Sequence, residues 1–335
     1  MANPIPSRLL PDNTFIDENG NGSIGGCDLV ELAEEFGTPL FVYDESHLRA
    51  RCQEAVKAFG EGVAYAGKAF LCGAMSRLVV EEGMNIDVST GGELYMALHA
   101  GIDGSRLIMH GNNKSESELR MALEADVSRI VVDSFDELDR LQTLHKETGT
   151  SPKILLRITP GVEAHTHEYI STGQDDSKFG FTVSTGVALE AVERAIRTEA
   201  VELVGIHAHI GSQVFKVDSF VRAVEVMAEF SNPLELPELS IGGGLGVSYL
   251  EEDTAPSITE WGEAVKTACL QTGIKAKVTA EPGRAIAAAA AVTLYRVGTI
   301  KELEGLRTYV AVDGGMSDNP RPVLYGSGYE TFLPR

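Results

Sequence analysis

The sequence has few cysteines and few basic side chains, and each shortage argues against a class of protein. Its four cysteines, at positions 27, 52, 72 and 269 of 335, form no C-x-x-C pair, so we expect free thiols and no disulfide framework. Lysine and arginine number 28 against 49 aspartates and glutamates, which gives a formal net charge of −21. We therefore expect no nucleic-acid partner, because such a partner needs a basic surface.

Long apolar runs are also missing. The most apolar stretch, residues 285–294, is mostly alanine and is too short to span a bilayer. The first 13 residues contain three prolines and lack the apolar core of a signal peptide. We expect a cytoplasmic protein without a membrane partner.

Apolar strands and amphipathic helices alternate along most of the chain. The pattern predicts strands at 63–66, 86–88, 107–109, 130–132, 154–158, 204–210, 239–242 and 276–280. Between them it predicts helices near 72–82, 91–100, 115–124, 134–148, 184–198, 217–229 and 259–273. Eight such units predict an α/β protein with a closed (β/α)8 barrel of the TIM type. The alternative, a doubly wound open sheet, would usually carry a G-x-G-x-x-G after an early strand, and the sequence has none.

The two ends of the chain differ from this alternation. Residues 1–45 form an N-terminal segment that is irregular up to about residue 25, with a helix at 28–36 and a strand at 39–43. Residues 46–285 form the barrel. Residues 286–335 begin a β-rich domain with strands at 288–297 and 308–312, and we expect the early strand 41–43 to pair with it.

Side chains suited to catalysis or ligand binding follow the predicted barrel strands, at the face where barrel enzymes carry catalytic groups. Lys68 follows the first strand, and its amine suits a Schiff base with an aldehyde cofactor, although a lone lysine in a loop is more often solvated and idle. The other groups at this face are His110, Asn112, Asn113, Lys114, Arg157, His209, Gly211, Ser212, Gln213, Gly242, Gly243, Gly244, Glu281, Gly283 and Arg284.

Three consecutive glycines, Gly242 to Gly244, end the seventh strand. They indicate a phosphate site, because glycine lets backbone amides approach an anion closely; a tight turn explains one glycine but not three. Glu281 lies beside this site and has the chemistry to keep a pyridine nitrogen protonated. The alternative is an ordinary ion pair between Glu281 and Arg284.

The sequence around the sixth strand places His207 and His209 on one face. We interpret His207 as a buried, hydrogen-bonded core histidine and His209 as a ring that can stack on a cofactor. A metal pair is the weaker hypothesis, since no cysteine or carboxylate stands at helical ligand spacing. Ser134 and Glu137 fit a capping box.

Two further features, a pair of acidic residues and a long insertion, are also candidates for function. Asp87 and Glu93 either orient the lysine, contact a substrate amine or cap a helix. The long insertion at 159–182, which includes His165, His167 and Tyr169, is predicted to be functional because of its length.

Taken together, these motifs resemble the fold type III pyridoxal-phosphate decarboxylases, and most closely the diaminopimelate decarboxylase family. The resemblance covers the chain from residue 41 onward. The matching motifs are YAGKA around Lys68, HGNNK at 110–114, STGQDDSKFG at 171–180, HAHIGSQ at 207–213, GGG at 242–244, EPGR at 281–284 and DGGMSDNPRP at 313–322.

The resemblance implies a role for each matched residue. Lys68 would form the Schiff base with pyridoxal 5'-phosphate and His209 would stack on its ring. Ser212, Gly243 and Gly244 would hold the phosphate. Glu281 would pair with the ring nitrogen, and Gly283 and Arg284 would line the cofactor and substrate pocket. Arg321 and Tyr325 would bind the distal carboxylate of the substrate, and the 159–182 insertion would lie over the pocket.

The implied reaction is decarboxylation of meso-2,6-diaminopimelate to L-lysine and CO2, the last step of lysine biosynthesis by that route, in a homodimer. The family also has a later Cys-Glu-Ser-Gly-Asp segment that reaches the partner's active site; this motif is not in the sequence, so we expect a chain that lacks the C-terminal part.

Three alternatives remain. A related decarboxylase of ornithine, arginine or carboxynorspermidine is disfavoured by Arg321, because a basic substrate end has no use for an arginine. An alanine-racemase-like enzyme usually has an arginine where this chain has Glu281. A cofactor-binding but catalytically inactive fragment is the third alternative.

Overall fold

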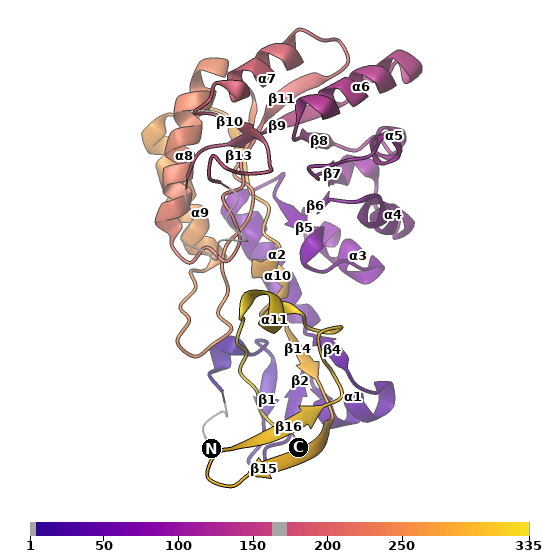
Figure 1. Ribbon diagram of the computed structural model, residues 1–335, viewed down its shortest axis with the longest axis vertical. Helices are drawn as coiled ribbons and strands as arrows, with labels where there is room; N and C mark the ends of the chain where they lie inside the picture. The colour runs from indigo at the N-terminus through magenta and orange to yellow at the C-terminus, as the bar shows by residue number, and fades with distance from the viewer. Residues whose placement is uncertain (1–4, 163–172, 335) are drawn as a thin grey trace. The chain divides into compact units, whose positions relative to one another are not determined.

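The computed structural model describes residues 5–162 and 173–334 (Figure 1). The chain divides into two compact units, which are described separately. The barrel unit consists of Arg51–Gly246 and Ala255–Ile286. The second unit consists of Met1–Ala50, Val247–Thr254 and Ala287–Arg335.

The barrel unit contains eight parallel strands in the order β13-β12-β11-β9-β8-β7-β6-β5. Their bounds are β5 (Ala64–Ala66), β6 (Asn85–Val88), β7 (Leu107–Met109), β8 (Arg129–Val132), β9 (Lys153–Thr159), β11 (Glu202–His207), β12 (Glu238–Ser240) and β13 (Lys277–Thr279). Backbone N–H groups of Ala64 and Ala66 donate to the carbonyls of Ala280 and Pro282 at 3.0 and 3.1 Å. These bonds join the first strand to the residues after the last, so the barrel closes as predicted.

Helices follow the strands and lie outside them (Figure 1). Their bounds are α3 (Gly73–Glu81), α4 (Gly91–His99), α5 (Glu116–Glu124), α6 (Phe135–Thr148), α7 (Val187–Ile196), α8 (Val217–Ser231) and α9 (Ile258–Thr272). Hydroxyl side chains begin several of them: Ser115 and Ser257 form capping boxes with Glu118 and Glu260. The predicted strand–helix alternation is confirmed.

Small and branched side chains fill the barrel. Five strands contribute to one buried cluster, which consists of Ala64, Ile108, Val131, Leu155 and Val204. Side chains from strands that are not neighbours in the sheet can share a cluster only across the barrel interior, so the barrel is a packed core with its polar groups at the rim.

The insertion after β9 contains a short strand, β10 (Phe181–Thr182), which pairs in parallel with the end of β9. Its residues 163–172, with His165, His167 and Tyr169, lie outside the described residues. The prediction that the insertion lies over the pocket therefore stays a prediction.

The second unit is mainly antiparallel. β4 (Leu40–Tyr43) pairs with β14 (Ala291–Leu294), as the sequence predicts for the early strand, and β15 (Val297–Leu303) pairs with β16 (Arg307–Val312). Helices α1 (Leu29–Phe36) and α11 (Arg321–Tyr325) belong to this unit, while α2 (Glu45–Phe59) and α10 (Arg284–Ala287) each contain a unit boundary. None of the described helices is both long and apolar enough to cross a bilayer.

The expectation of an irregular start up to about residue 25 is wrong. β1 (Thr14–Ile16), β2 (Gly22–Ile24) and β3 (Cys27–Asp28) form a three-stranded antiparallel sheet. The Asp17 carboxylate accepts from the N–H groups of Asn19 and Asn21, both at 2.8 Å, and so fixes the turn between the first two strands. The strands have only two or three residues each and are joined by turns that contain glycine and asparagine, which explains why their sequence pattern is weak.

Candidate active site

Lys68 stands at the barrel rim, in the single 3-10 turn Gly67–Ala69 directly after β5. Its side chain remains exposed to solvent, yet the surrounding barrel atoms desolvate the amine and lower its pKa from the usual lysine value. The positive charge of Arg157 lowers the pKa further, against the opposing carboxylates of Asp87 and Glu281. A lysine with a depressed pKa and an accessible amine is suited to nucleophilic attack on a carbonyl.

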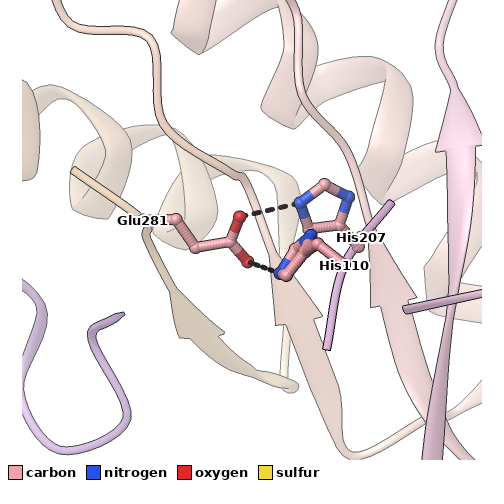
Figure 2. Close-up of side chains that lie close together, drawn as sticks. All are labelled: His110, His207 and Glu281. Carbon is pink, nitrogen blue, oxygen red and sulfur yellow. Dashed lines mark hydrogen bonds and ion pairs between the residues drawn. The ribbon is translucent and has the colours of Figure 1, made fainter. Parts of the chain in front are cut away.

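Glu281 follows β13 and lies at the centre of a buried polar cluster (Figure 2). Its Oε2 accepts a hydrogen bond from Nε2 of His207 at 2.9 Å, and its Oε1 accepts one from the Ser240 hydroxyl at 2.6 Å. Burial opposes ionisation, but the two imidazoles His207 and His110 and these hydrogen bonds outweigh it, so the pKa of Glu281 is held well below its usual range.

Figure 2 shows the rings of His207 and His110 next to each other, each facing one oxygen of the Glu281 carboxylate. Nε2 of His110 lies 3.7 Å from Oε1 of Glu281 and 3.5 Å from Oδ1 of Asp87. Burial lowers the pKa of His110 to about 4, and it raises the pKa of Asp87 well above the usual value, helped by the negative charge of Glu281. Of the two carboxyl groups, Glu281 therefore ionises first, and Asp87 holds its proton more strongly.

The three glycines bring the backbones of neighbouring strands into close contact. A Cβ on Gly243 would lie 2.2 Å from the carbonyl oxygen of Glu281, and one on Gly244 would lie 2.1 Å from that of Gly211. Gly242 and Gly244 also have φ of +66° and +112°. Packing alone thus requires glycine at each position.

The N–H of Gly243 donates to Nδ1 of His209 at 3.2 Å. This bond makes Nδ1 of His209 an acceptor, and burial lowers the pKa of the ring well below its usual value, so the ring is neutral. The phosphate contacts predicted for Gly243 and Gly244 stay predictions.

Ser212 and Arg284 lie together at the same rim, where Nη2 of Arg284 donates to the Ser212 hydroxyl at 3.3 Å. Gly283 precedes Arg284 and packs against β5: a Cβ on Gly283 would lie 2.9 Å from that of Ala66. Lys68, Ser212, Glu281 and Arg284 thus all follow strands of the barrel unit at their carboxyl ends. Arg321 and Tyr325 lie in α11 of the second unit, where the Arg321 guanidinium lies 5.4 Å from the Tyr325 ring centre.

A second buried network supports the rim. The amine of Lys114 donates to Oε1 of Glu137 and to the carbonyls of Gly111 and Val131. Arg157 pairs with Asp133 at 3.3 Å. Lys114 and Arg157, both candidates at the predicted catalytic face, are thus held in buried ion pairs.

The structure shows how the acidic and hydroxyl side chains at the starts of α6 and α4 are bonded. Ser134 caps α6, but the Glu137 carboxylate accepts from the N–H of Asp133, so the reciprocal capping box does not form. The Glu93 carboxylate accepts from the N–H of Ser89 at 2.6 Å and Thr90 accepts from the N–H of Glu93, which is the helix-capping reading.

Sequence reasoning missed Ser240 and the meeting of the two histidines with Glu281. His207 is buried and hydrogen-bonded, as interpreted, but its partner is the central carboxylate. His110, His207 and Glu281 also offer ligand-type atoms within 4.8 Å of one another, a set that helical spacing could not reveal because it comes from three strand ends. The sequence signal that could have identified Ser240 is its position: it is a polar residue in a buried strand, two positions before Gly242.

The residues present fit a pyridine cofactor with an aldehyde and a phosphate. The site offers an amine with a lowered pKa at Lys68 and a buried anionic carboxylate at Glu281. Oδ1 of Asp87 and Nε2 of His110 are buried, and neither has a hydrogen-bond partner within residues 5–162 and 173–334. Such polar atoms at the rim indicate a site built for a polar ligand.

Comparison with known proteins shows the family of the barrel. Residues 45–288 match the family described as "Pyridoxal-dependent decarboxylase, pyridoxal binding domain". Fold, site and match together define a pyridoxal-dependent decarboxylase, whose cofactor is pyridoxal phosphate.

Comparison with individual relatives identifies the family within this class of decarboxylases. The chain is 47% identical to diaminopimelate decarboxylase from Mycobacterium tuberculosis, over 98% of this chain and 78% of that protein. It is also 47% identical to the Bacillus subtilis enzyme of that name, over 94% of this chain and 75% of that protein. The chain belongs to the diaminopimelate decarboxylase family.

Solved structures show the same relationship. The structure of diaminopimelate decarboxylase from M. jannaschii in complex with L-lysine has a TM-score of 0.87 and 34% identity, over 95% of this chain and 77% of that one. The Helicobacter pylori enzyme complexed with L-lysine has a TM-score of 0.83 and 31% identity, over 90% of this chain and 76% of that one.

Proposed function

We propose that the chain catalyses the decarboxylation of meso-2,6-diaminopimelate to L-lysine and CO2, with pyridoxal phosphate as cofactor. The observation that carries the proposal is the buried Glu281 carboxylate, held anionic by His207 and Ser240 in the barrel of a chain 47% identical to diaminopimelate decarboxylases. Burying a carboxylate anion costs free energy unless a cation pairs with it, and a protonated pyridine nitrogen is such a cation.

Pyridoxal phosphate, when bound, supplies a protonated ring that accepts the electron pair left by departing CO2. Glu281 holds the proton on the ring nitrogen, because a low pKa keeps its carboxylate ionised at neutral pH. Lys68 provides the amine that condenses with the cofactor aldehyde, and its lowered pKa increases the share of unprotonated amine.

The remaining rim residues orient the cofactor. We assign His209 to stacking on the ring, with its plane fixed by the bond from the Gly243 N–H. Ser212 and Arg284, which already bond to each other, offer a hydroxyl and a cation to the phosphate and the substrate. Gly283 keeps the Arg284 turn close to β5.

Arg321 and Tyr325 are assigned to the distal carboxylate of the substrate. A guanidinium binds a carboxylate with two parallel hydrogen bonds, which distinguishes a substrate with a second carboxylate from ornithine or arginine. Nε of Arg321 is buried without a hydrogen-bond partner among the described residues, so it retains a donor for a ligand.

We also propose a homodimer in the cytoplasm. Several large apolar side chains on β15 and β16 are exposed, and two of them, Ile300 and Val310, are register partners on one face of the strand pair. Such a patch favours association with another subunit. Sedimentation of the purified chain tests the dimer, and a monomer at all concentrations would contradict it.

The function is tested by product analysis. The purified chain with pyridoxal phosphate is incubated separately with meso-diaminopimelate, ornithine and arginine, and the amine products are identified by mass spectrometry. We expect lysine from meso-diaminopimelate and no product from the other two. Decarboxylation of ornithine at a comparable rate would favour the related decarboxylases, and binding of the cofactor without any product would favour a chain that binds pyridoxal phosphate without catalysis.

A further inference from the structure

Two hydrogen-bond donors converge on Glu281 from neighbouring strands. His207 and Ser240 are register partners in the parallel pair β11–β12, so their side chains stand at the same level of the barrel. His207 donates to Oε2 of Glu281 and Ser240 to Oε1, so each carboxylate oxygen has its own donor. The two donors fix both the position and the rotation of the carboxylate group.

A second carboxylate competes for the negative charge. Asp87 is 5% exposed and Glu281 is 7% exposed, and His110 Nε2 stands between their oxygens, 3.5 Å from one and 3.7 Å from the other. Oδ1 of Asp87 is buried and has no hydrogen-bond partner in the part of the chain that the structure describes. Two buried carboxylates this near to each other cannot both be ionised cheaply, so the one with more donors takes the charge.

The hydrogen bonds also decide the tautomer of His207. Its Nε2 must carry the proton, because a carboxylate oxygen can only accept. Its Nδ1 is buried and has no hydrogen-bond partner among the residues described. Burial also lowers the pKa of the ring, so the ring is neutral at neutral pH with Nδ1 unprotonated. His207 therefore acts as a neutral donor.

We propose that His207 and Ser240 are positioning residues that place the negative charge of the Asp87–Glu281 pair on Glu281 and leave the proton on Asp87 before any cofactor binds. The consequence for the cofactor rests on the proposed function, in which Glu281 faces the ring nitrogen. The charged groups Lys68, Arg157 and Glu93 and the neutral ring of His110 also surround the pair, but no hydrogen bond from them to Glu281 is seen among the described residues.

The first test needs no cofactor. Protein labelled with 13C at the glutamate carboxyl carbon is titrated with acid, and the signal absent from Glu281→Gln is assigned to Glu281. We expect this carboxylate to remain ionised below about pH 4, and its titration to move upward by at least about one pH unit in Ser240→Ala and more in His207→Phe. His207→Gln keeps an N–H donor at the same reach and should restore part of the shift.

Controls separate positioning from general damage. Ser231→Ala replaces another buried serine, in α8 and outside the site, and should leave the Glu281 titration unchanged. If His207→Phe does not fold, Ser240→Ala and His207→Gln still decide the question. An unchanged Glu281 titration in folded Ser240→Ala would overturn the proposal, and so would a 15N spectrum showing His207 as the Nδ1–H tautomer.

The second test measures pyridoxal phosphate binding by fluorescence titration of the same variants. Loss of one donor to a charged group should weaken cofactor binding by about tenfold or more, and His207→Gln should lose less than His207→Phe. If Glu281 titrates as expected but the parent chain releases no CO2 from meso-diaminopimelate, the proposed function fails and this inference stands. If CO2 is released and Ser240→Ala titrates as the parent does, the inference fails and the function stands.

Discussion

The amine of Lys114 and the Oε1 atom of Glu137 lie 2.7 Å apart, and both side chains are almost completely buried. The pair joins the loop after β7, which contains Lys114, to the first turn of α6, which contains Glu137. The same amine also donates to the carbonyls of Gly111 and Val131. Lys114, a candidate of the catalytic face by sequence, thus has all three of its N–H bonds committed to the protein.

This pair predicts a large effect on stability. Lys114→Met leaves the Glu137 charge buried and unpaired, so it should lower the free energy of unfolding by about 3–5 kcal/mol. The exposed pair Arg120–Glu147 provides the control, and Arg120→Ala should leave the free energy of unfolding almost unchanged. Urea unfolding measures both. Equal effects of the two variants would contradict a structural role for the buried pair, and replacing Lys114 and Glu137 together should recover most of the loss.

His110 predicts a dependence of stability on pH. Its pKa is lowered by burial to about 4, whereas an unfolded histidine titrates near 6.5, so between these values the unfolded chain binds a proton that the folded chain does not. The contribution of His110 to the free energy of unfolding should therefore fall as the pH is lowered through this window, by up to about 3 kcal/mol. His207 and His209, whose pKa values are also lowered, act in the same direction, whereas Asp87 and Glu137, whose pKa values are raised, act in the opposite direction.

Replacing His110 by asparagine tests this origin. The variant should lose less stability than the parent between about pH 6.5 and about pH 4, as judged from urea midpoints at several pH values. Parallel pH profiles for the two proteins would show that His110 is not the group responsible. Titration of Glu281 itself falls at lower pH and does not obscure this window, because its contribution is lost only below its unfolded value of about 4.5.

Gly243 predicts a steric effect at the centre of the site. An alanine Cβ there would lie 2.2 Å from the carbonyl oxygen of Glu281 and would push two strand ends apart. Gly243→Ala should cost about 1–3 kcal/mol or more in stability and weaken pyridoxal phosphate binding. Gly298→Ala is the control, since its Cβ would meet nothing closer than 3.8 Å. If Gly243→Ala behaved like Gly298→Ala in both measurements, the close approach of the backbones would be refuted.

Arg321 predicts a separation of substrate and cofactor binding. Arg321→Ala should raise the KM for meso-diaminopimelate by about 10- to 100-fold, the value of a charge-assisted hydrogen bond, and leave the Kd for pyridoxal phosphate unchanged. Arg307→Ala, at an exposed position on β16, should alter neither constant. A KM within twofold of the parent would remove Arg321 from the substrate site.

The barrel could be predicted from the sequence because its strands are short apolar runs and its helices carry clear caps. Once the strands are assigned, parallel topology places Lys68, His209 and Glu281 at one rim of the barrel. The candidate site could therefore be predicted without knowing any side-chain contact. The glycines after β12 were also identified, although their φ values and close contacts give packing as a sufficient reason for them.

The contacts within the site could not be predicted in the same way. The bond between His207 and Glu281 depends on the register of three strands, and sequence spacing contains no information about that register. For the same reason the sequence assigned His207 to the core and overlooked Ser240. The sheet β1–β3 was missed because its turn depends on the side-chain bonds of Asp17 and not on an apolar pattern.

The most direct test of the account is the absorption spectrum of the purified chain with pyridoxal phosphate, recorded before and after addition of meso-diaminopimelate with CO2 followed in the same cuvette. We predict a Schiff-base band that is absent in Lys68→Ala, a change of that band on addition of substrate, and release of CO2. A correctly folded parent chain that shows no Schiff-base band, or one whose band persists in Lys68→Ala, would contradict the assignment of this rim as the cofactor site.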